Sequence, residues 1–182
     1  VKYMAKRIFI VSSSPRKGGN SDALAEEFKR GAEAAGNEVE KVNVRDIDLK
    51  FCLGCLYCQD HDRCVINDSM NDICNRVQKA DILVFATPIY YYEMCGQLKT
   101  FLDRLNPLYP RENRFKEVYL LAAAAEDEPT TTDGAKKGVE GWIECFDGVS
   151  LKRVIFGGGV TDKGEIAGSP ALKEAYEAGF NA

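Results

Sequence analysis

The sequence predicts an α/β fold in which a parallel sheet of five strands is covered by helices on both faces. Five short apolar segments alternate along the 182 residues with segments whose apolar residues recur at helical spacing. Two of them, in RIFIV and DILVFA, are continuous apolar runs, which is typical of strands that are buried on both sides in a parallel sheet. No repeat, low-complexity stretch or linker divides the chain, so we expect a single domain over residues 1–182.

The first strand is predicted at residues 7–11 and the first helix at residues 21–35. RIFIV is a continuous apolar run. The helix has apolar residues three or four positions apart, namely Leu24, Ala25, Phe28, Ala32 and Ala35. Gly36 stands just past the last of these, as is common at helix ends.

The next two strands are predicted at residues 39–44 and 81–86, with helices at about 70–79 and 96–105. A cysteine-rich segment separates the second strand from its helix. The run DILVFA, in the third strand, is a continuous apolar segment. Each strand is thus followed by a helix, which requires parallel neighbours and right-handed connections.

The last two strands are predicted at residues 118–125 and 151–156, and the last two helices at 134–146 and 171–180. VYLLAAAA is long enough for a central strand. In open parallel sheets, ligands bind beyond the carboxyl ends of the strands. The loops at those ends are therefore the places to search for function.

The composition excludes several classes of protein. The formal net charge is −4 and the charges are interspersed, so we expect no nucleic-acid partner. No apolar run approaches the roughly 20 residues of a membrane span, and the first residues lack the pattern of a signal peptide. We therefore expect a cytoplasmic protein without a membrane partner.

The segment SSSPRKGGNS, residues 12–21, joins the first strand to the first helix. Hydroxyls, glycines and two cations meet there at a helix N-terminus, which favours binding of a phosphate group. The segment lacks the patterns G-x-x-x-x-G-K-[ST] and G-x-G-x-x-G, which argues against a nucleoside triphosphatase and a dinucleotide site. The alternative is an ordinary β-α turn, since these residue types are common in turns.

Two motifs resemble the flavodoxin-like family of NAD(P)H-dependent FMN reductases. The first loop follows that family's pattern S-x-S-P-R-x-x-x-N-[ST], with matches at Ser12, Ser14, Pro15, Arg16, Asn20 and Ser21. The second motif is TPIY, followed by GQLK at residues 96–99 and by Asp103 and Arg104. The resemblance covers residues from about 7 to 125.

The resemblance implies a flavodoxin-like three-layer sandwich that binds FMN. The first loop would hold the phosphate, and the second would run along the isoalloxazine ring through Thr87, Pro88, Ile89, Tyr90, Tyr91 and Tyr92. Three consecutive tyrosines suit a planar cofactor, although they also suit a subunit interface. Where relatives have a Gly- or Ser-rich flavin loop after the fourth strand, this chain has Ala122 to Ala125.

The resemblance also implies a reaction. NADH or NADPH would reduce the flavin, which would pass electrons to a small-molecule or protein acceptor such as a quinone, free flavin or metal ion. Flavin carries the hydride chemistry itself, so we expect no catalytic side chain, and no acid–base set stands out. Relatives lead us to expect a homodimer or homotetramer.

Four of the seven cysteines, Cys52, Cys55, Cys58 and Cys64, have the spacing C-x2-C-x2-C-x5-C. Such a set is able to wrap an iron-sulfur cluster, and it resembles the iron-sulfur flavoprotein branch of the same family, in which the motif holds a [4Fe-4S] cluster. Zinc is a weaker alternative, because its sites more often pair two C-x2-C units. A thiol-rich loop without metal is the third interpretation.

Three functions follow from these patterns. The first is an FMN-dependent NAD(P)H oxidoreductase, the second an electron-transfer flavoprotein with FMN and a [4Fe-4S] cluster, and the third a thiol or metal sensor without flavin. The remaining cysteines, Cys74, Cys95 and Cys145, are expected to be buried. Arg104 is expected to be solvated or paired, with Asp103 as its partner.

Overall fold

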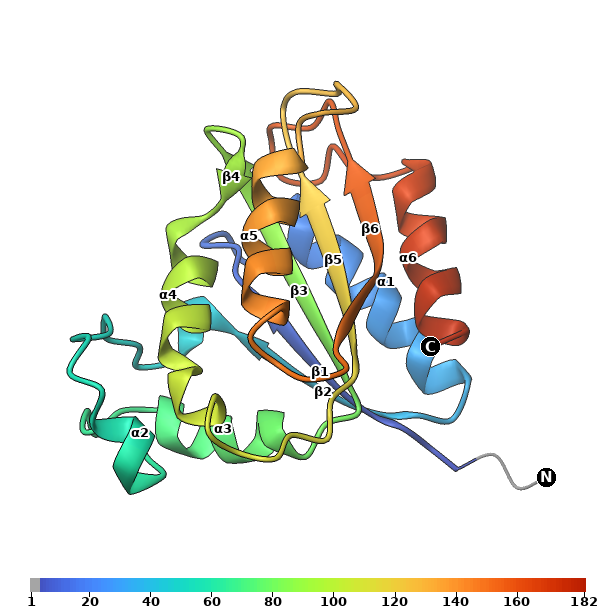
Figure 1. Cartoon of the computed structure of the whole chain (residues 1–182). Coiled ribbons are helices and arrows are strands. Elements are labelled where there is room, and N and C mark those ends of the chain that lie inside the picture. The colour runs from blue at the N-terminus through green and yellow to red at the C-terminus, as the bar shows by residue number, and fades with distance from the viewer. Residues whose placement is uncertain (1–3) are drawn as a thin grey trace.

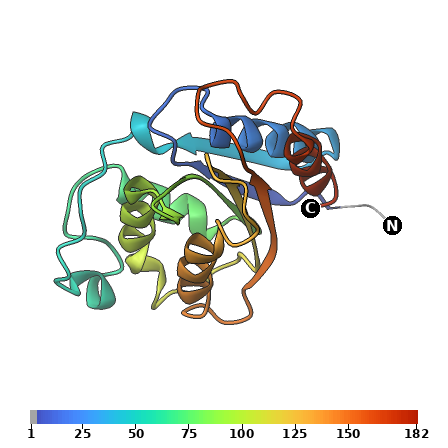
Figure 2. The ribbon, with the colours of Figure 1, turned by 90° about the horizontal axis from the view of Figure 1, so that it is seen from above.

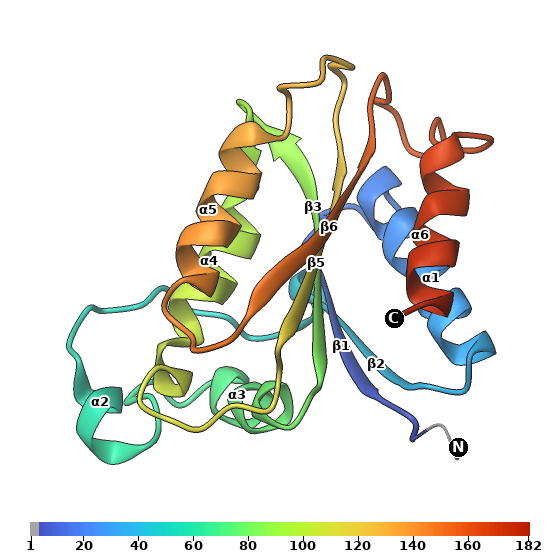
Figure 3. The ribbon, with the colours of Figure 1, turned by 45° about the vertical axis from the view of Figure 1, so that its right-hand side comes forward.

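A computed structural model describes residues 4–182; residues 1–3 of the predicted domain lie outside this part. A parallel sheet forms the middle layer of three (Figures 1 and 3). Its strands are β1 (Arg7–Ser12), β2 (Glu38–Asn43), β3 (Ile82–Tyr90), β5 (Glu117–Ala123) and β6 (Ser150–Gly157). Their order, β2-β1-β3-β5-β6, is that of flavodoxin-like folds.

Helices cover both faces of the sheet, as predicted. One face carries α1 (Asn20–Ala34) and α6 (Pro170–Phe180). The other carries α3 (Met70–Gln78), α4 (Gly96–Arg104) and α5 (Asp133–Ile143), and Figure 2 shows the two sets on opposite sides of the strands. Shorter pieces are α2 (Tyr57–His61) and the 3-10 turns η1 (Val44–Asp46) and η2 (Asn106–Leu108).

The alternation of side chains along the strands divides the core in two. In β1, Ile8 and Ile10 join the cluster that lies against α1 and α6. Phe9 and Val11 join the cluster that lies against α3, α4 and α5. Successive residues of a strand point to opposite faces, so continuous apolar strands are what this double-sided core requires.

The predicted number of strands needs correction. The sheet has six strands, because the two-residue strand β4 (Glu93–Met94) pairs antiparallel with the end of β3. In addition, Thr87 to Tyr90 belong to β3 rather than to a loop. Pro88 signals a loop, but β1 pairs with β3 only as far as Ala86, so the proline stands beyond its ladder with β1.

The prediction for Cys145 is also wrong, because its thiol is exposed, whereas Cys74 and Cys95 are buried as expected. Helix α5 ends at Ile143 instead of Phe146. Beyond it the backbone tightens, with N–H groups of Cys145 and Phe146 donating to carbonyls three residues earlier. Such a tightened turn rotates the side chain off the buried face.

Helices α1 and α6 pack at unusually close range. A Cβ on Gly31 would lie 2.0 Å from the carbonyl oxygen of Tyr176, and a Cβ on Gly179 would lie 2.0 Å from that of Phe28. Each helix thus offers a glycine where the backbone of the other approaches. Among residues 4–182, no helix is both long and apolar enough to cross a bilayer.

Candidate functional site

The two motif loops meet at one edge of the sheet, beyond the carboxyl ends of β1 and β3. The backbone N–H of Ser13 donates to the carbonyl oxygen of Ala86 over 2.9 Å, and its hydroxyl donates to the same oxygen over 2.6 Å. The Cys95 thiol lies 3.2 Å from that hydroxyl. Strand order reverses between β1 and β3, and such a switch point is where parallel sheets bind ligands.

Glycines allow the first loop to fold tightly before α1. The Ser14 hydroxyl donates to the carbonyl oxygen of Arg16 over 3.1 Å. A Cβ on Gly19 would lie 2.7 Å from the oxygen of that hydroxyl. Gly18 has a φ of +65°, a left-handed conformation that glycine adopts without steric cost. The loop therefore curls around the N-terminus of α1.

A buried carboxylate, that of Asp22, supports the loop from the protein interior. It accepts hydrogen bonds from the Ser12 hydroxyl and the Lys41 ammonium over 2.6 Å each, and from the N–H of Gly18 over 3.1 Å. Arg45 lies 4.0 Å away. Burial alone would raise the pKa of Asp22, but these hydrogen bonds and the charge of Lys41 hold that pKa below its usual value. No pattern in the sequence indicates this network.

The outer side of the loop has the features that a phosphate group requires. Ser21, in the first turn of α1, has a buried hydroxyl with no hydrogen-bond partner among residues 4–182. In the same part of the chain no carboxylate pairs with Arg16 or Lys17. An unpaired donor, two cations without a carboxylate partner and the helix N-terminus together fit an anion. The expected phosphate site is consistent with this geometry.

Asn20, which is expected to bind the cofactor, is hydrogen-bonded to a distant loop in this structure. Its amide NH₂ donates to the carbonyl oxygen of Asp162 over 2.9 Å, and its amide oxygen accepts from the N–H groups of Gly164 and Ile166. The Arg16 guanidinium also donates to the carbonyl oxygen of Thr161 over 2.9 Å. These contacts fasten the loop between β6 and α6 to the first motif.

The second motif ends in an exposed tyrosine turn, Tyr90 to Tyr92. Tyr91 is fully exposed, and Tyr91 and Tyr92 have φ values of 49° and 63°. Two consecutive left-handed residues other than glycine are strained, and such strain is typical of functional sites. Thr87 is buried and engaged, since its hydroxyl donates to the carbonyl oxygen of Pro88 and accepts from the N–H of Cys95. The rings are free to contact a ligand, whereas Thr87 shapes the turn.

Comparison with known protein families identifies the family to which this chain belongs. The family model described as NADPH-dependent FMN reductase matches residues 6–133. The chain belongs to this family. The match contains both motif loops and the cysteine segment between them.

Among curated members, an iron-sulfur flavoprotein of Archaeoglobus fulgidus is 35% identical over 97 residues, which cover 53% of this chain and 44% of that protein. An iron-sulfur flavoprotein of Methanosarcina thermophila is 29% identical over 164 residues, which cover 90% of this chain and 83% of that protein. The match thus spans under half of the first relative and most of the second.

A solved structure agrees on the fold. The NAD(P)H:quinone oxidoreductase from Methanothermobacter marburgensis superposes with a TM-score of 0.77 at 17% identity, covering 98% of this chain and 97% of that one. At this identity the likeness concerns the fold alone. The flavodoxin-like architecture expected from the sequence is confirmed.

The four clustered cysteines of this FMN reductase family member line one small pocket beside the C-terminal end of α4. Cys58 is buried, Cys64 is partly buried, and Cys52 and Cys55 are exposed. Apolar side chains complete the pocket, among them Leu53, Leu56, Val65, Ile66 and Pro107. Among residues 4–182, however, no three His, Cys, Asp or Glu side chains stand where they could hold a metal ion. The four cysteines thus lie together in one pocket, but their side chains are not arranged to bind a metal ion.

Three N–H donors point at sulfurs of this pocket. The Asn106 amide donates to the sulfur of Cys58 over 3.2 Å, and the Arg104 guanidinium to that of Cys64 over 3.4 Å. The backbone N–H of Gly54 donates to the sulfur of Cys52 over 3.4 Å. Hydrogen bonds to sulfur are among the features that tune iron-sulfur clusters. These N–H donors suit a cluster, but the four cysteines of the described residues are not arranged to bind a metal ion.

A buried ion pair fastens the cysteine segment at both ends. Arg104 donates to the two carboxylate oxygens of Asp68 over 2.6 and 2.8 Å and to the carbonyl oxygen of Lys50 over 2.7 Å. Asp68 in turn accepts from the N–H of Lys50. Burial alone would raise the pKa of Asp68, but the Arg104 hydrogen bonds hold it below its usual value. The expected partner of Arg104 was wrong, since Asp103 pairs with Lys99.

The cysteine pocket and the motif loops lie at opposite ends of α4. Helix α4 begins at Gly96, next to the tyrosine turn, and ends at Arg104. Nine residues of helix span about 13–14 Å. In Figure 1 the cysteine segment accordingly lies low beside α4, away from the carboxyl ends of the strands.

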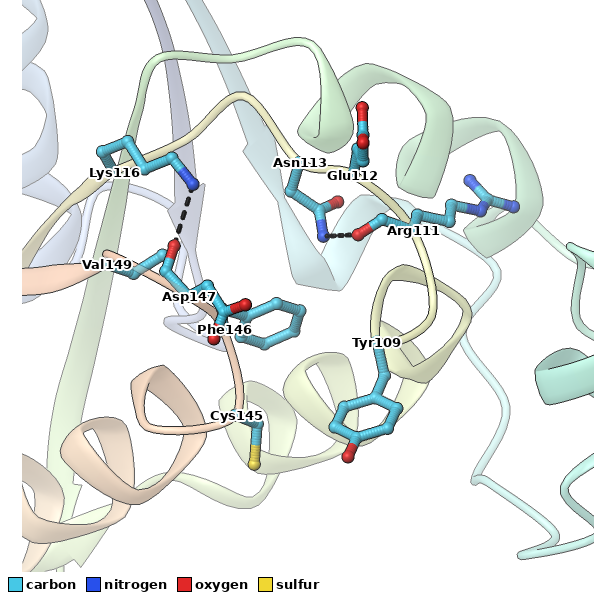
Figure 4. Close-up of a pocket in the computed structure, with 9 residues that line it drawn as sticks. All are labelled: Tyr109, Arg111, Glu112, Asn113, Lys116, Cys145, Phe146, Asp147 and Val149. Atoms are coloured by element: carbon cyan, nitrogen blue, oxygen red, sulfur yellow. Dashed lines mark hydrogen bonds between the residues drawn. The ribbon is translucent and has the colours of Figure 1, made fainter.

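A further pocket, of about 570 Å³, lies at the amino ends of β5 and β6 (Figure 4). Its two cations already have partners. Lys116 donates to the carbonyl oxygen of Asp147 over 2.8 Å, and the Arg111 guanidinium turns away to pair with Asp62. We assign no chemistry to this pocket.

Proposed function

We propose that this chain is an FMN-dependent NAD(P)H oxidoreductase that passes electrons to a quinone, flavin, metal or protein acceptor. The observation that carries the proposal is the first loop at the β1/β3 switch point, with its buried unpaired Ser21 hydroxyl and two cations that have no carboxylate partner among residues 4–182. Membership of the family supports it. Its cytoplasmic location stays a prediction.

The residues of this chain would act by binding and orientation. Ser12, Ser14, Pro15 and Arg16 form the curled loop, and Ser21 with the N-terminus of α1 offers donors to a phosphate. Pro88, Ile89 and the tyrosine turn would bound one side of the ring. When bound, FMN supplies the hydride and electron transfer, so no acid–base side chain is required.

Titration of the flavin-free protein with FMN tests this proposal. We expect one FMN per chain, followed by oxidation of NADH or NADPH when a quinone is supplied. Arg16→Ala should weaken FMN binding about tenfold through loss of a charge-assisted contact. Arg153→Ala is the matched control, because Arg153 is an exposed arginine that pairs with Glu174. A protein that binds no flavin would disprove the proposal and favour the sensor function.

A second function, electron transfer through FMN and a [4Fe-4S] cluster, has its own support. The four cysteines of the C-x2-C-x2-C-x5-C motif line one pocket and receive three N–H donors. Two relatives are named iron-sulfur flavoproteins. Cys52, Cys55, Cys58 and Cys64 would be the ligands.

Anaerobic reconstitution with iron and sulfide tests the cluster. We expect about four irons and four sulfides per chain. Cys58→Ser should lose them, whereas Cys145→Ser should retain them, because Cys145 is an exposed thiol outside the motif. Iron content at background level would refute the cluster, and tight zinc binding by the same thiols would point to a zinc site instead.

A further inference from the structure

The loop between β6 and α6, residues 158–169, folds over the first motif loop. Three hydrogen bonds with Asn20, one donated and two accepted by its side chain, and one donated by Arg16 fasten residues 161–166 there. Within the loop, the Glu165 carboxylate accepts from the N–H groups of Thr161 and Asp162. The loop is thus held both by the motif and by itself, although it lies outside the segment that the family model matches.

This arrangement puts one cation on the first motif loop. The side chain of Lys163 crosses Gly18: its Cε lies 3.2 Å and its Nζ 3.5 Å from the place where a Cβ of Gly18 would stand. Because Gly18 has no side chain, the side chain of Lys163 is able to occupy this space. The left-handed φ of Gly18 also disfavours any larger residue.

The charges around the loop leave Lys163 available. Asp22, the buried carboxylate beneath the loop, is already neutralised by Lys41. The Glu165 carboxylate is turned onto backbone N–H groups. Among residues 4–182, no carboxylate lies within ion-pair distance of Lys163, and the same holds for Arg16 and Lys17. Three cations without a carboxylate partner, Arg16, Lys17 and Lys163, thus lie in or against the loop that precedes α1, where the Ser21 hydroxyl is unpaired.

We propose that Lys163 is a third arm of the phosphate site, which binds the phosphate monoester of FMN from the β6–α6 loop, and that Asn20 serves to position this arm. The inference rests on the proposed function, because it takes FMN as the ligand of the first loop. A flexible ammonium near a phosphate contributes charge and a hydrogen bond without fixed geometry. Arginine at this position should therefore replace lysine.

Flavin titrations of four proteins test the inference: wild type, Lys163→Ala, Lys163→Arg and Lys152→Ala. Lys152 is an exposed lysine of β6 that pairs with Glu117, so it controls for loss of charge alone. FMN and riboflavin are the two ligands, since they differ only by the phosphate. We expect Lys163→Ala to raise the Kd for FMN about five- to tenfold, with the Kd for riboflavin unchanged. Lys163→Arg and Lys152→Ala should both behave as wild type.

Salt gives a second readout. The Kd for FMN should depend less steeply on ionic strength in Lys163→Ala than in wild type, since one screened charge is gone. Equal weakening of FMN and riboflavin, or unchanged FMN binding in Lys163→Ala, would overturn the role of Lys163 and leave the proposed function standing. Failure of the wild type to bind FMN would remove both.

Discussion

Asp22 and Asp68 are buried carboxylates, and each lies beside a cation under one of the two candidate sites. Lys41 neutralises Asp22 beneath the first motif loop, and Arg104 pairs with both oxygens of Asp68 beneath the cysteine pocket. Removing one partner of such a pair leaves an uncompensated buried charge, which costs more than the pair contributes. The shape of each loop therefore depends on a residue that faces away from the ligand.

The pH dependence of stability tests the role of Asp22. Its pKa is lower in the folded protein than the ordinary value of 3.8, so the stability it contributes is present above about pH 4 and is lost as the pH falls through the folded pKa. Asp22→Asn should lower the free energy of unfolding by about 2 kcal/mol at pH 7, and the gap to wild type should close below about pH 4. Urea denaturation at several pH values measures both.

The control for this experiment is Asp48→Asn. Asp48 is exposed, and its ion pair with Lys50 is long, at 4.0 Å, so it contributes little. We expect a change within about 0.5 kcal/mol at every pH. A gap for Asp22→Asn that stays constant with pH would contradict the assignment of its charge to the folded state.

Neither buried pair could be predicted from the sequence. Asp68 and Arg104 are 36 positions apart, and only the packing of α4 against the cysteine segment brings them together. The motif residues could be predicted from the sequence, since Ser12 to Ser21 are contiguous and follow directly from β1. For Asn20, the motif indicated importance but not the partner, because its hydrogen bonds reach a loop that the first motif does not contain.

At the scale of elements, helices α1 and α6 approach so closely that each requires a glycine opposite the backbone of the other. Gly31 faces Tyr176, and Gly179 faces Phe28. Glycine in a helix interior weakens the isolated helix. At these two positions the close contact between the helices offsets that loss of helix propensity.

Gly31→Ala should therefore destabilise the protein, because its methyl group would meet the carbonyl oxygen of Tyr176 at 2.0 Å. Overpacking of this kind costs about 1–3 kcal/mol. Gly141→Ala, in α5, is the matched control: nothing lies within 4 Å of its Cβ, so we expect a gain of roughly 0.5–1 kcal/mol. Thermal unfolding of both variants measures these two changes in stability. Equal effects at the two positions would refute the close-contact account.

The elements themselves could largely be predicted, because five apolar strands and five amphipathic helices have strong periodic patterns. The small elements could not. Strand β4 has two residues and follows a left-handed turn of two tyrosines, where hairpins usually have Asn-Gly. Helix α2 has five residues flanked by left-handed Leu56 and Asp62, so it has too little periodicity to detect.

For the whole molecule, the exposed apolar side chains gather in two places. The tyrosine turn forms one, and the cysteine segment, with Phe51, Leu53 and Leu56 exposed, forms the other. Large exposed aromatic groups are typical of interaction surfaces. The tyrosine turn is therefore a candidate surface for contact with a second chain.

We therefore expect a homodimer or homotetramer whose contact includes the tyrosine turn. Tyr91→Ser should shift the mass measured by light scattering toward that of one chain, because Tyr91 is fully exposed in the monomer. Tyr109→Ser is the control, as Tyr109 is an exposed tyrosine at the other end of α4. A wild-type mass of a single chain with FMN bound would exclude this assembly.

The hydrogen bonds of Asn20 have a consequence for biosynthesis. The first motif leaves the ribosome early, but Asp162, which Asn20 holds, is 142 positions later. At about 5–20 residues per second, ~7–28 s separate the two during translation. A nascent chain thus has its first loop exposed long before the loop's closing partner exists. Cofactor capture should accordingly be among the last events of maturation, after α6 has docked.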